Sequence, residues 1–306
     1  MRLGDYRTSD NVSDQGQGSS GFGGFGGGGG GGIIGLLFGL VLSRFGIVGV
    51  VILLLGYCAL GMMGGGGGLG TGTAPHQAAG TGATSDAQQA CSSDPAKRFS
   101  CQVLASSEDT WAKLFAANGQ RYQPPALSFY GGGGQSGCGI AQSAMGPFYC
   151  PTDQKIYLDT AFFDELQNRF AASGDFAQAY VIAHEVGHHI QNLTGVLTDA
   201  SARQQRLSSR EGNAVQVRVE LQADCYAGVW AANARDAKGQ LMEPGDVEEG
   251  LRAAQAIGDD TLQRQAQGRV VPEAFTHGSS AQRTAWLKRG LESGDPAACD
   301  TFKGAV

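Results

Sequence analysis

The sequence lacks an excess of positive charge. Its 22 Lys and Arg residues are outnumbered by 28 Asp and Glu residues, which gives a formal net charge of −6. The first 90 residues contribute only −1 of this charge, so residues 91–306 carry −5. A chain with this balance offers no basic surface for a phosphate backbone, and we expect no nucleic-acid partner.

The first 90 residues lack the side chains that a packed core needs. They contain 28 of the 50 glycines, although they make up less than a third of the 306 residues. We expect residues 1–32 to be a cytoplasmic, Gly-rich disordered segment and residues 64–90 to be a Gly/Thr/Ala-rich linker. Residues 91–306 are numerous enough to bury roughly 70% of their surface on folding. One folded domain is therefore predicted there, and a wholly disordered protein or a coiled coil is excluded.

Only one long apolar region is present, which excludes a multi-span membrane protein. Residues 45–63 contain no charged side chain, and a shorter apolar stretch precedes them from residue 33. Such a run can cross the ~30 Å hydrocarbon layer of a membrane as a helix. We therefore predict one transmembrane anchor over residues 33–63. A buried core helix is the alternative, although the Gly-rich segments on both sides offer it nothing to pack against.

The basic residues predict the orientation of this anchor. All three arginines of the first 90 residues precede residue 45, and the next basic residue is Lys97. Basic residues beside a membrane helix favour the cytoplasmic side. The expected protein is thus a single-pass protein of the cell inner membrane, with a cytoplasmic N-terminus and a periplasmic domain.

The cysteines lack the CxxC spacing of a structural zinc site. One of the seven lies in the predicted anchor, and six follow it. An even number of cysteines in an exported domain suggests three disulfides, with six buried thiols as the alternative. Proximity in the sequence favours the pairs Cys91–Cys101 and Cys138–Cys150, which leaves Cys225–Cys299.

The pattern of apolar residues predicts an α+β domain that is mainly helical with a small β-sheet. Strands are expected at residues 126–130 and 155–159, with a loop or hairpin between them, and the second strand could pair with an extended peptide at a sheet edge. Helices are expected at residues 107–119, 160–172, 175–193, 197–208, 211–236, 246–257 and 279–291.

The most informative residues are His184, Glu185 and His188, which form an HExxH motif in a predicted helix. Residues four apart lie on one helix face about 6 Å apart, so both imidazoles can bind one Zn²⁺. Glu185 is offset by one residue, where it can take a proton from water whose pKa zinc lowers to ~7. The alternative is two exposed histidines on an ordinary helix, and neighbouring His189 is given no role.

A third ligand is needed, and the HExxHxxGxxH pattern does not supply it, because Gln191 and Thr194 occupy its last two positions. The next candidate is Glu220, which stands four residues before Asp224 in a predicted helix. Glu220 would bind zinc, while Asp224 would accept the second N–H of a ligand histidine. A solvated acidic face is one alternative. Glu211 is a rival ligand, but at a helix start its carboxylate would instead stabilise the helix dipole.

His277 precedes the last predicted helix, which carries Arg283. A zinc peptidase benefits from a donor directed at the oxyanion of the tetrahedral intermediate. Either His277 or Arg283 could provide that donor, and packing at the helix start is the alternative role for His277. We list His277 as a catalytic candidate beside Glu185.

Five sequence motifs together resemble those of the bacterial neutral zinc metallopeptidase family: YRTSDN, GPFYCPTDQKIYLD, HEVGHHIQ, RVELQADCYAG and FTHGSSAQRTAWLKRG. The resemblance covers nearly the whole chain except its Gly-rich segments. It implies a zincin-like domain of the gluzincin type behind a single membrane span, with His184, His188 and Glu220 as ligands and Glu185 as the catalytic glutamate. Gly278 stands where more distant gluzincins of the prenyl-protease and heat-shock types have proline.

These features predict a membrane-anchored endopeptidase that uses one Zn²⁺ to hydrolyse peptide or protein substrates, over residues 91–306. One alternative is a zinc-containing binding or scaffold protein without catalysis. Glu185 argues against it, and a structural site would close the fourth position with another Cys or His. A zinc hydrolase of cell-wall amides is the other alternative, and the sequence does not exclude it.

Overall fold

Two buried strands form the middle of the sheet. The structure is a computed structural model and describes residues 1–17 and 82–306. Strands β2 (Ala126–Gly131) and β6 (Lys155–Leu158) pair in parallel, and nearly all of their side chains are buried. A strand that is covered on both faces has a continuous apolar sequence, and this is why both strands lie within one residue of their predicted bounds.

Strand β5 (Phe148–Cys150) borders the sheet beyond β6, with which it pairs antiparallel. Within the described residues the order is β4-β3-β2-β6-β5, with β1 (Val12–Gln17) paired in parallel with β2. Since β6 lies inside the sheet, the prediction that residues 155–159 form its edge is wrong. The remaining strands are the hairpin of β3 (Gly133–Ser136) and β4 (Gly139–Gln142) and the separate pair of β7 (Arg235–Asp236) and β8 (Gly239–Gln240).

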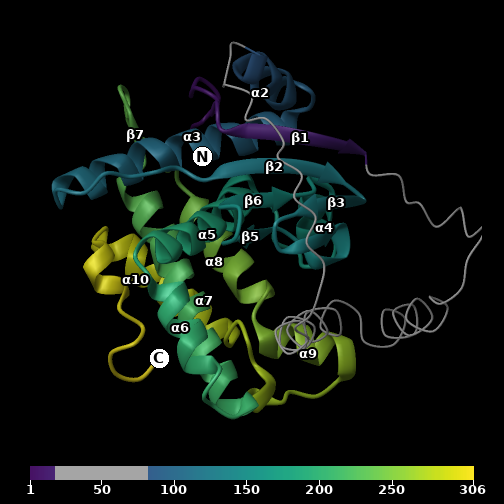
Figure 1. The fold of residues 1–306 in the computed structure, drawn as a ribbon, viewed down its shortest axis with the longest axis vertical. Coiled ribbons are helices and arrows are strands. Elements are labelled where there is room, and N and C mark those ends of the chain that lie inside the picture. Colours follow the sequence, from purple (N-terminus) through teal and green to yellow (C-terminus); the bar gives the residue numbers. More distant parts are fainter. Residues whose placement is uncertain (18–81) are drawn as a thin grey trace, which may run out of the picture.

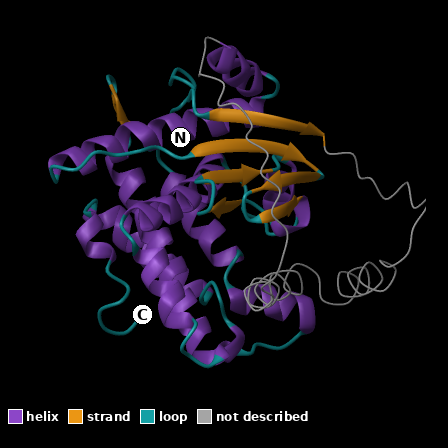
Figure 2. Ribbon diagram, in the orientation of Figure 1, coloured by secondary structure: helices purple, strands orange, loops and turns teal. Residues whose placement is uncertain are grey.

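Helices make up most of the described chain, and Figure 2 shows the strands of the larger sheet gathered in one part of it with helices around and below them. This is the predicted α+β class. The helices, which Figure 1 labels where there is room, are α2 (Gly82–Ser92), α3 (Pro95–Ala117), α4 (Ala161–Asn168), α5 (Asp175–Leu193), α6 (Val196–Gln204), α7 (Ser209–Asn233), α8 (Asp246–Ala256), α9 (Asp259–Gln267) and α10 (Ser280–Ser293).

Local capping sets the bounds of these helices. The motif helix α5 has the predicted bounds, and Gly195 after its end has φ +81°. Helix α7 starts two residues earlier than predicted, because Ser208 and Glu211 form a capping box. Helix α3 starts well before residue 107, because Asp94 caps it by accepting a hydrogen bond from the backbone N–H of Lys97.

The N-terminal segment, residues 1–17, is part of the domain. β1 pairs with β2, the side chain of Leu3 is buried, and the terminal ammonium of Met1 lies 2.7 Å from Asp175 and 3.1 Å from Asp246. The expectation of a disordered segment is therefore wrong for these residues. Likewise the domain includes α2, which begins in the region expected to be a linker, so residues 91–306 alone are not the folding unit.

The predicted membrane topology is also wrong. No helix within residues 1–17 and 82–306 has the length and apolar character to cross a membrane. The predicted anchor, residues 33–63, lies outside the described residues. The two described parts share one sheet, so a cytoplasmic N-terminus with a periplasmic domain is impossible in this fold. The predicted single-pass localisation in the inner membrane is therefore wrong.

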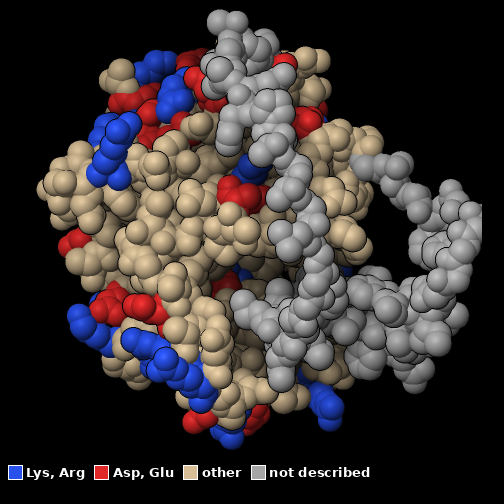
Figure 3. Space-filling model, in the orientation of Figure 1, with Lys and Arg blue, Asp and Glu red and all other residues tan. Residues whose placement is uncertain are grey.

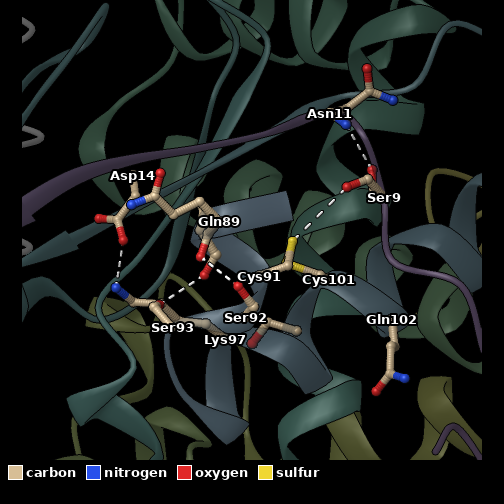
Figure 4. Close-up of a disulfide and its surroundings, with 12 residues drawn as sticks. Ser9, Asn11, Asp14, Gln89, Cys91, Ser92, Ser93, Lys97, Cys101 and Gln102 are labelled. Carbon is tan, nitrogen blue, oxygen red and sulfur yellow. Dashed lines mark hydrogen bonds and ion pairs between the residues drawn. A yellow bond between two sulfur atoms is a disulfide. The ribbon is translucent and has the colours of Figure 1, made fainter. Parts of the chain in front are cut away.

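The three predicted disulfides are all present. Cys91–Cys101 joins α2 to α3, Cys138–Cys150 joins the β3–β4 turn to β5, and Cys225–Cys299 joins α7 to the 3-10 turn Pro296–Cys299. Such bonds persist in oxidising compartments and are typical of exported proteins. Figure 4 shows the first disulfide beneath the N-terminal segment, with Ser9 and Asn11 nearby.

Ion pairs hold the N-terminal segment in place. Arg7 lies 2.7 Å from Asp109 of α3, and Asp14 lies 2.6 Å from Lys97, the contact drawn in Figure 4. In the upper part of the molecule, where α3 and β1 lie in Figure 1, acidic and basic side chains adjoin each other (Figure 3). Burial raises the pKa of Asp109 and of Asp14. Hydrogen bonds and charge from their cationic partners lower the same pKa values by more, so both lie below the ordinary range.

We expect acid to release the N-terminal segment before the rest of the domain. A carboxyl group whose pKa is lower in the folded state than in the unfolded state stabilises the fold at any pH above its unfolded pKa of ~3.9. This stabilisation is lost as the pH falls through the folded-state pKa. Hydrogen exchange of the β1 amides should therefore accelerate below about pH 4 relative to α5. Asp109→Asn should weaken this pH dependence. Unchanged relative protection of β1 between pH 6 and pH 3 would contradict the prediction.

Candidate metal centre

Helix α5 brings the two motif histidines to one face. The helix is buried along most of its length, with Phe176, Ile182 and Val186 fixing its rotation in the core. The rings of His184 and His188 are consequently neighbours, with centroids 4.7 Å apart. This is the arrangement expected for residues four apart on a helix.

Helix α7 supplies the third candidate ligand, Glu220. Its Oε2 lies 3.2 Å from Nε2 of His184 and 3.5 Å from Nε2 of His188. One ligand atom from each of these residues lies within 4.8 Å of the other two. The second carboxylate oxygen of Glu220 accepts a hydrogen bond of 2.9 Å from Gln216, so the side chain is held with Oε2 toward the imidazoles.

A glycine inside the motif allows α5 and α7 to approach this closely. A Cβ atom on Gly187 would lie 2.9 Å from both Cα and O of Ala223. Real side chains do not tolerate such a contact with backbone. The glycine of HEVGH therefore sets the helix separation that lets Glu220 reach the histidines.

We expect Gly187→Ala to weaken zinc binding at least tenfold and to lower the melting temperature. The added methyl group must push α7 away, and overpacking of this kind typically costs about 1–3 kcal/mol. The matched control is Gly212→Ala in α7, where a Cβ would have 4.0 Å of room to Gln204. Chelator competition and thermal unfolding measure both variants. Wild-type zinc affinity in Gly187→Ala would contradict the role of close helix packing.

Asp224 orients His184 from the side opposite Glu220. Nδ1–H of His184 donates to Asp224 Oδ1 at 2.8 Å, as the spacing of Glu220 and Asp224 predicts. The same carboxylate accepts a hydrogen bond of 2.6 Å from the hydroxyl of Tyr180. Each of its two oxygens also accepts a hydrogen bond of 2.9 Å from the guanidinium of Arg283. Burial raises the pKa of Asp224, but Arg283 and His184 outweigh it and lower the pKa to about 2.

Both histidines present the same nitrogen to Glu220. Nδ1 of His188 lies 2.9 Å from Oε1 of Gln191, so each Nδ1–H has an acceptor, and Nε2 is the nitrogen that presents a lone pair when the ring is neutral. Burial lowers the pKa of His188, but the Glu220 carboxylate outweighs this and raises it to about 9. Two imidazole Nε2 atoms and one carboxylate are a donor set that zinc takes, and their residues fit the ion.

Glu185 and the three candidate ligands line one cleft. It has a volume of about 460 Å³ and also reaches His277. Most of its other lining is apolar, as in Phe148, Phe162, Phe170, Val181, Leu197 and Leu262. Burial raises the pKa of Glu185, while His188 and His184 oppose that rise. The site is therefore accessible from a cleft large enough for several side chains.

The two candidates for an oxyanion donor are placed differently. Arg283 is buried and its guanidinium is committed to Asp224, so it is not free to turn toward a substrate. His277 lines the cleft, and its side chain is 35% exposed. The backbone N–H of His277 donates to Asp259 at 2.6 Å, which fixes the start of the turn before α10.

The rival residues have structural roles. Glu211 lies at the exposed start of α7, where it accepts hydrogen bonds from the hydroxyl and backbone N–H of Ser208. His189 is fully buried, and its Nε2–H donates to the carbonyl of Gln123 while Nδ1 accepts from Tyr149. Its pKa is lowered, because burial disfavours the charged ring.

Two residues that hold the site were missed in the sequence. Tyr180 stands one turn before His184, and from the sequence alone it is expected only to supply an apolar contact of the helix. Gln191 stands three residues after His188, which is the spacing of neighbours on one helix face. That spacing is the only signal in the sequence that could have identified Gln191 as a partner of the histidine.

Comparison with known proteins identifies the family of the chain. The family model described as "Putative neutral zinc metallopeptidase" matches residues 1–302. "Uncharacterized protein YpfJ" of Escherichia coli (strain K12) is 52% identical over 213 residues, which are 70% of this chain and 74% of that protein. "Uncharacterized protein Rv2575" of Mycobacterium tuberculosis (strain ATCC 25618 / H37Rv) is 45% identical over 233 residues, 72% of this chain and 76% of that protein. No solved structure matches the chain. The family predicted from the five motifs is thus confirmed, and the chain belongs to the neutral zinc metallopeptidase family.

Proposed function

We propose that the chain is a zinc-dependent endopeptidase with a gluzincin-like site in a zincin-like domain. His184, His188 and Glu220 would hold one Zn²⁺. The observation that carries the proposal is the convergence of two imidazole Nε2 atoms and one carboxylate in a cleft that Glu185 also lines. A zinc ion bound there supplies Lewis-acid chemistry, since it polarises a carbonyl and makes water more acidic.

Glu185 acts as the proton carrier in this proposal. Glu185 follows the candidate ligand His184 in the sequence. It lines the cleft but does not belong to the group of candidate ligands formed by His184, His188 and Glu220. From this position its carboxylate accepts a proton from the attacking water and then donates it to the amine that leaves. Its limited exposure, 6%, keeps competing solvent away from that proton.

His277 is the proposed donor to the oxyanion. Both candidates line the cleft, but the guanidinium of Arg283 is bound to Asp224, whereas the side chain of His277 is 35% exposed. A donor that is already in place stabilises the developing negative charge without reorganisation. Asp224 in turn keeps His184 in the tautomer that presents Nε2.

The strand that borders the cleft suits an extended polypeptide. β5 forms the edge of the sheet, and its Phe148 and Tyr149 line the cleft. A peptide could add to such an edge through backbone hydrogen bonds. The apolar lining would then receive alternate side chains, as happens when an unfolded segment binds.

The test is to incubate the full-length, zinc-loaded chain with an unfolded protein and, separately, with cell-wall fragments, and to identify products by mass spectrometry. New termini inside the unfolded protein are expected. Products from cell-wall cross-links alone would instead identify an amide hydrolase of the wall. Bound zinc without any product would indicate a binding or scaffold protein.

A further inference from the structure

The two candidate ligand histidines are held by chemically different partners. His184 donates to the carboxylate of Asp224, whereas His188 donates to the neutral carboxamide of Gln191. Gln191 is completely buried. It therefore has no solvent to satisfy its polar atoms, and each of its hydrogen bonds must come from the protein.

The surroundings of Gln191 fix the orientation of its amide. Its Nε2 lies 2.7 Å from the backbone oxygen of Val219, and a carbonyl oxygen can only accept a hydrogen bond. The NH₂ group must therefore face Val219, which directs Oε1 toward Nδ1 of His188 at 2.9 Å. Since Oε1 can only accept, Nδ1 must carry the proton and Nε2 must be the nitrogen that is free to bind a metal.

A second glutamine continues this chain of hydrogen bonds. Nε2 of Gln191 also donates to Oε1 of Gln222 at 3.0 Å. Nε2 of Gln222 donates to the backbone oxygen of Cys299 at 3.0 Å, which fixes the second amide for the same reason as the first. Cys299 is bonded to Cys225, the residue that follows Asp224 in α7. The Cys225–Cys299 disulfide thus adjoins the supports of both histidines.

We propose that Gln191 is a positioning residue for His188, and that Gln191 and Gln222 couple the metal centre to the Cys225–Cys299 disulfide. A dithiol reductant would convert this disulfide to two thiols while it is itself oxidised to a disulfide, and this would free the turn that carries the Cys299 carbonyl. The amide of Gln222 would then lose its fixed orientation, and the amide of Gln191 would lose its own as a result. His188 would no longer be held in one tautomer. The affinity for zinc would therefore depend on the redox state of Cys225–Cys299. This inference rests on the proposed zinc site but not on catalysis.

The experiment measures zinc affinity of the full-length chain by chelator competition. Gln191→Met keeps the approximate volume but removes the acceptor, and we expect a loss of roughly 10–100-fold, the usual effect of removing a partner of a ligand histidine. Gln222→Met should show a smaller loss. In addition, ¹⁵N NMR of the metal-free chain, at a pH high enough for the His188 ring to be neutral, should show the Nδ1–H tautomer in the wild type and a mixture in Gln191→Met. General destabilisation would not cause this change.

The disulfide is tested by a matched pair of double variants. Cys225→Ser with Cys299→Ser should weaken zinc binding about tenfold, in the range for partners of ligands. Cys91→Ser with Cys101→Ser removes a disulfide between α2 and α3, outside the cleft lining, and should bind zinc like the wild type. Circular dichroism identifies a temperature at which all variants are folded, and Gln222→Met tests the coupling if the first pair does not fold.

The outcomes separate this inference from the proposed function. Equal zinc affinity and an unchanged His188 tautomer in Gln191→Met and Gln222→Met would overturn the coupling and leave the metal site standing. A wild-type chain that binds no zinc would overturn the site and the proposed function together.

Discussion

Glu185→Gln is expected to abolish peptide hydrolysis while the protein still binds zinc. The variant keeps the size of the side chain but removes the group that accepts and returns the proton. General acid–base catalysis typically contributes about 10²–10⁴-fold, so the residual rate should lie at least two orders of magnitude below wild type. The candidate ligands His184, His188 and Glu220 are untouched, so the zinc content should stay at one ion per chain.

The measurement combines metal analysis with hydrolysis of an unfolded protein at several substrate concentrations. Loss of kcat with little change in KM is expected, because Glu185 acts on the reacting atoms. Glu211→Gln is the matched control, since Glu211 caps α7 far from the chemistry. Wild-type turnover in Glu185→Gln would show that another group carries the proton.

Glu220→Ala is expected to remove most of the zinc affinity. Two histidines would remain, and three protein ligands are typical of catalytic zinc sites. Glu211→Ala should keep its metal and lose only a small contribution to stability from a carboxylate at the helix N-terminus. Zinc titration of the two variants compares the only glutamates of α7, one inside the site and one at its exposed end.

Asp224→Asn should fall between these two in zinc affinity, about 10–100-fold below wild type. It should also destabilise the fold, because Arg283 is buried and would lose its carboxylate partner. Breaking a buried ion pair in this way typically costs about 3–5 kcal/mol. Full zinc retention in Glu220→Ala, or loss of zinc in Glu211→Ala, would contradict the assignment of Glu220 as the third ligand.

The parts of the fold that could be predicted are those whose sequence repeats one simple pattern. α5 combines apolar residues at helical spacing with a glycine after its end, and its predicted bounds match the structure. The relative positions of the candidate site residues could be predicted for the same reason. Because four residues make about one helical turn, His184 with His188, and Glu220 with Asp224, indicate their faces without knowledge of the fold.

The parts that could not be predicted depend on contacts between distant segments. β1 has mostly exposed, polar residues, and it is a strand because backbone hydrogen bonds join it to β2, more than 100 residues later. Its sequence beside a Gly-rich run gives no sign of that partner. The distance between α5 and α7 is likewise set by Gly187 meeting Ala223, which no local pattern encodes.

Titration of metal-free, full-length chain with zinc, while hydrolysis of an unfolded protein is recorded, tests the central claim most directly. The chelated protein should be inactive. Its activity should rise in proportion to added zinc and reach its maximum at one equivalent per chain, and in Glu220→Ala the same addition should restore little activity. Hydrolysis that persists in the chelated protein, or a fully active Glu220→Ala variant at one equivalent, would contradict a zinc peptidase built on His184, His188 and Glu220.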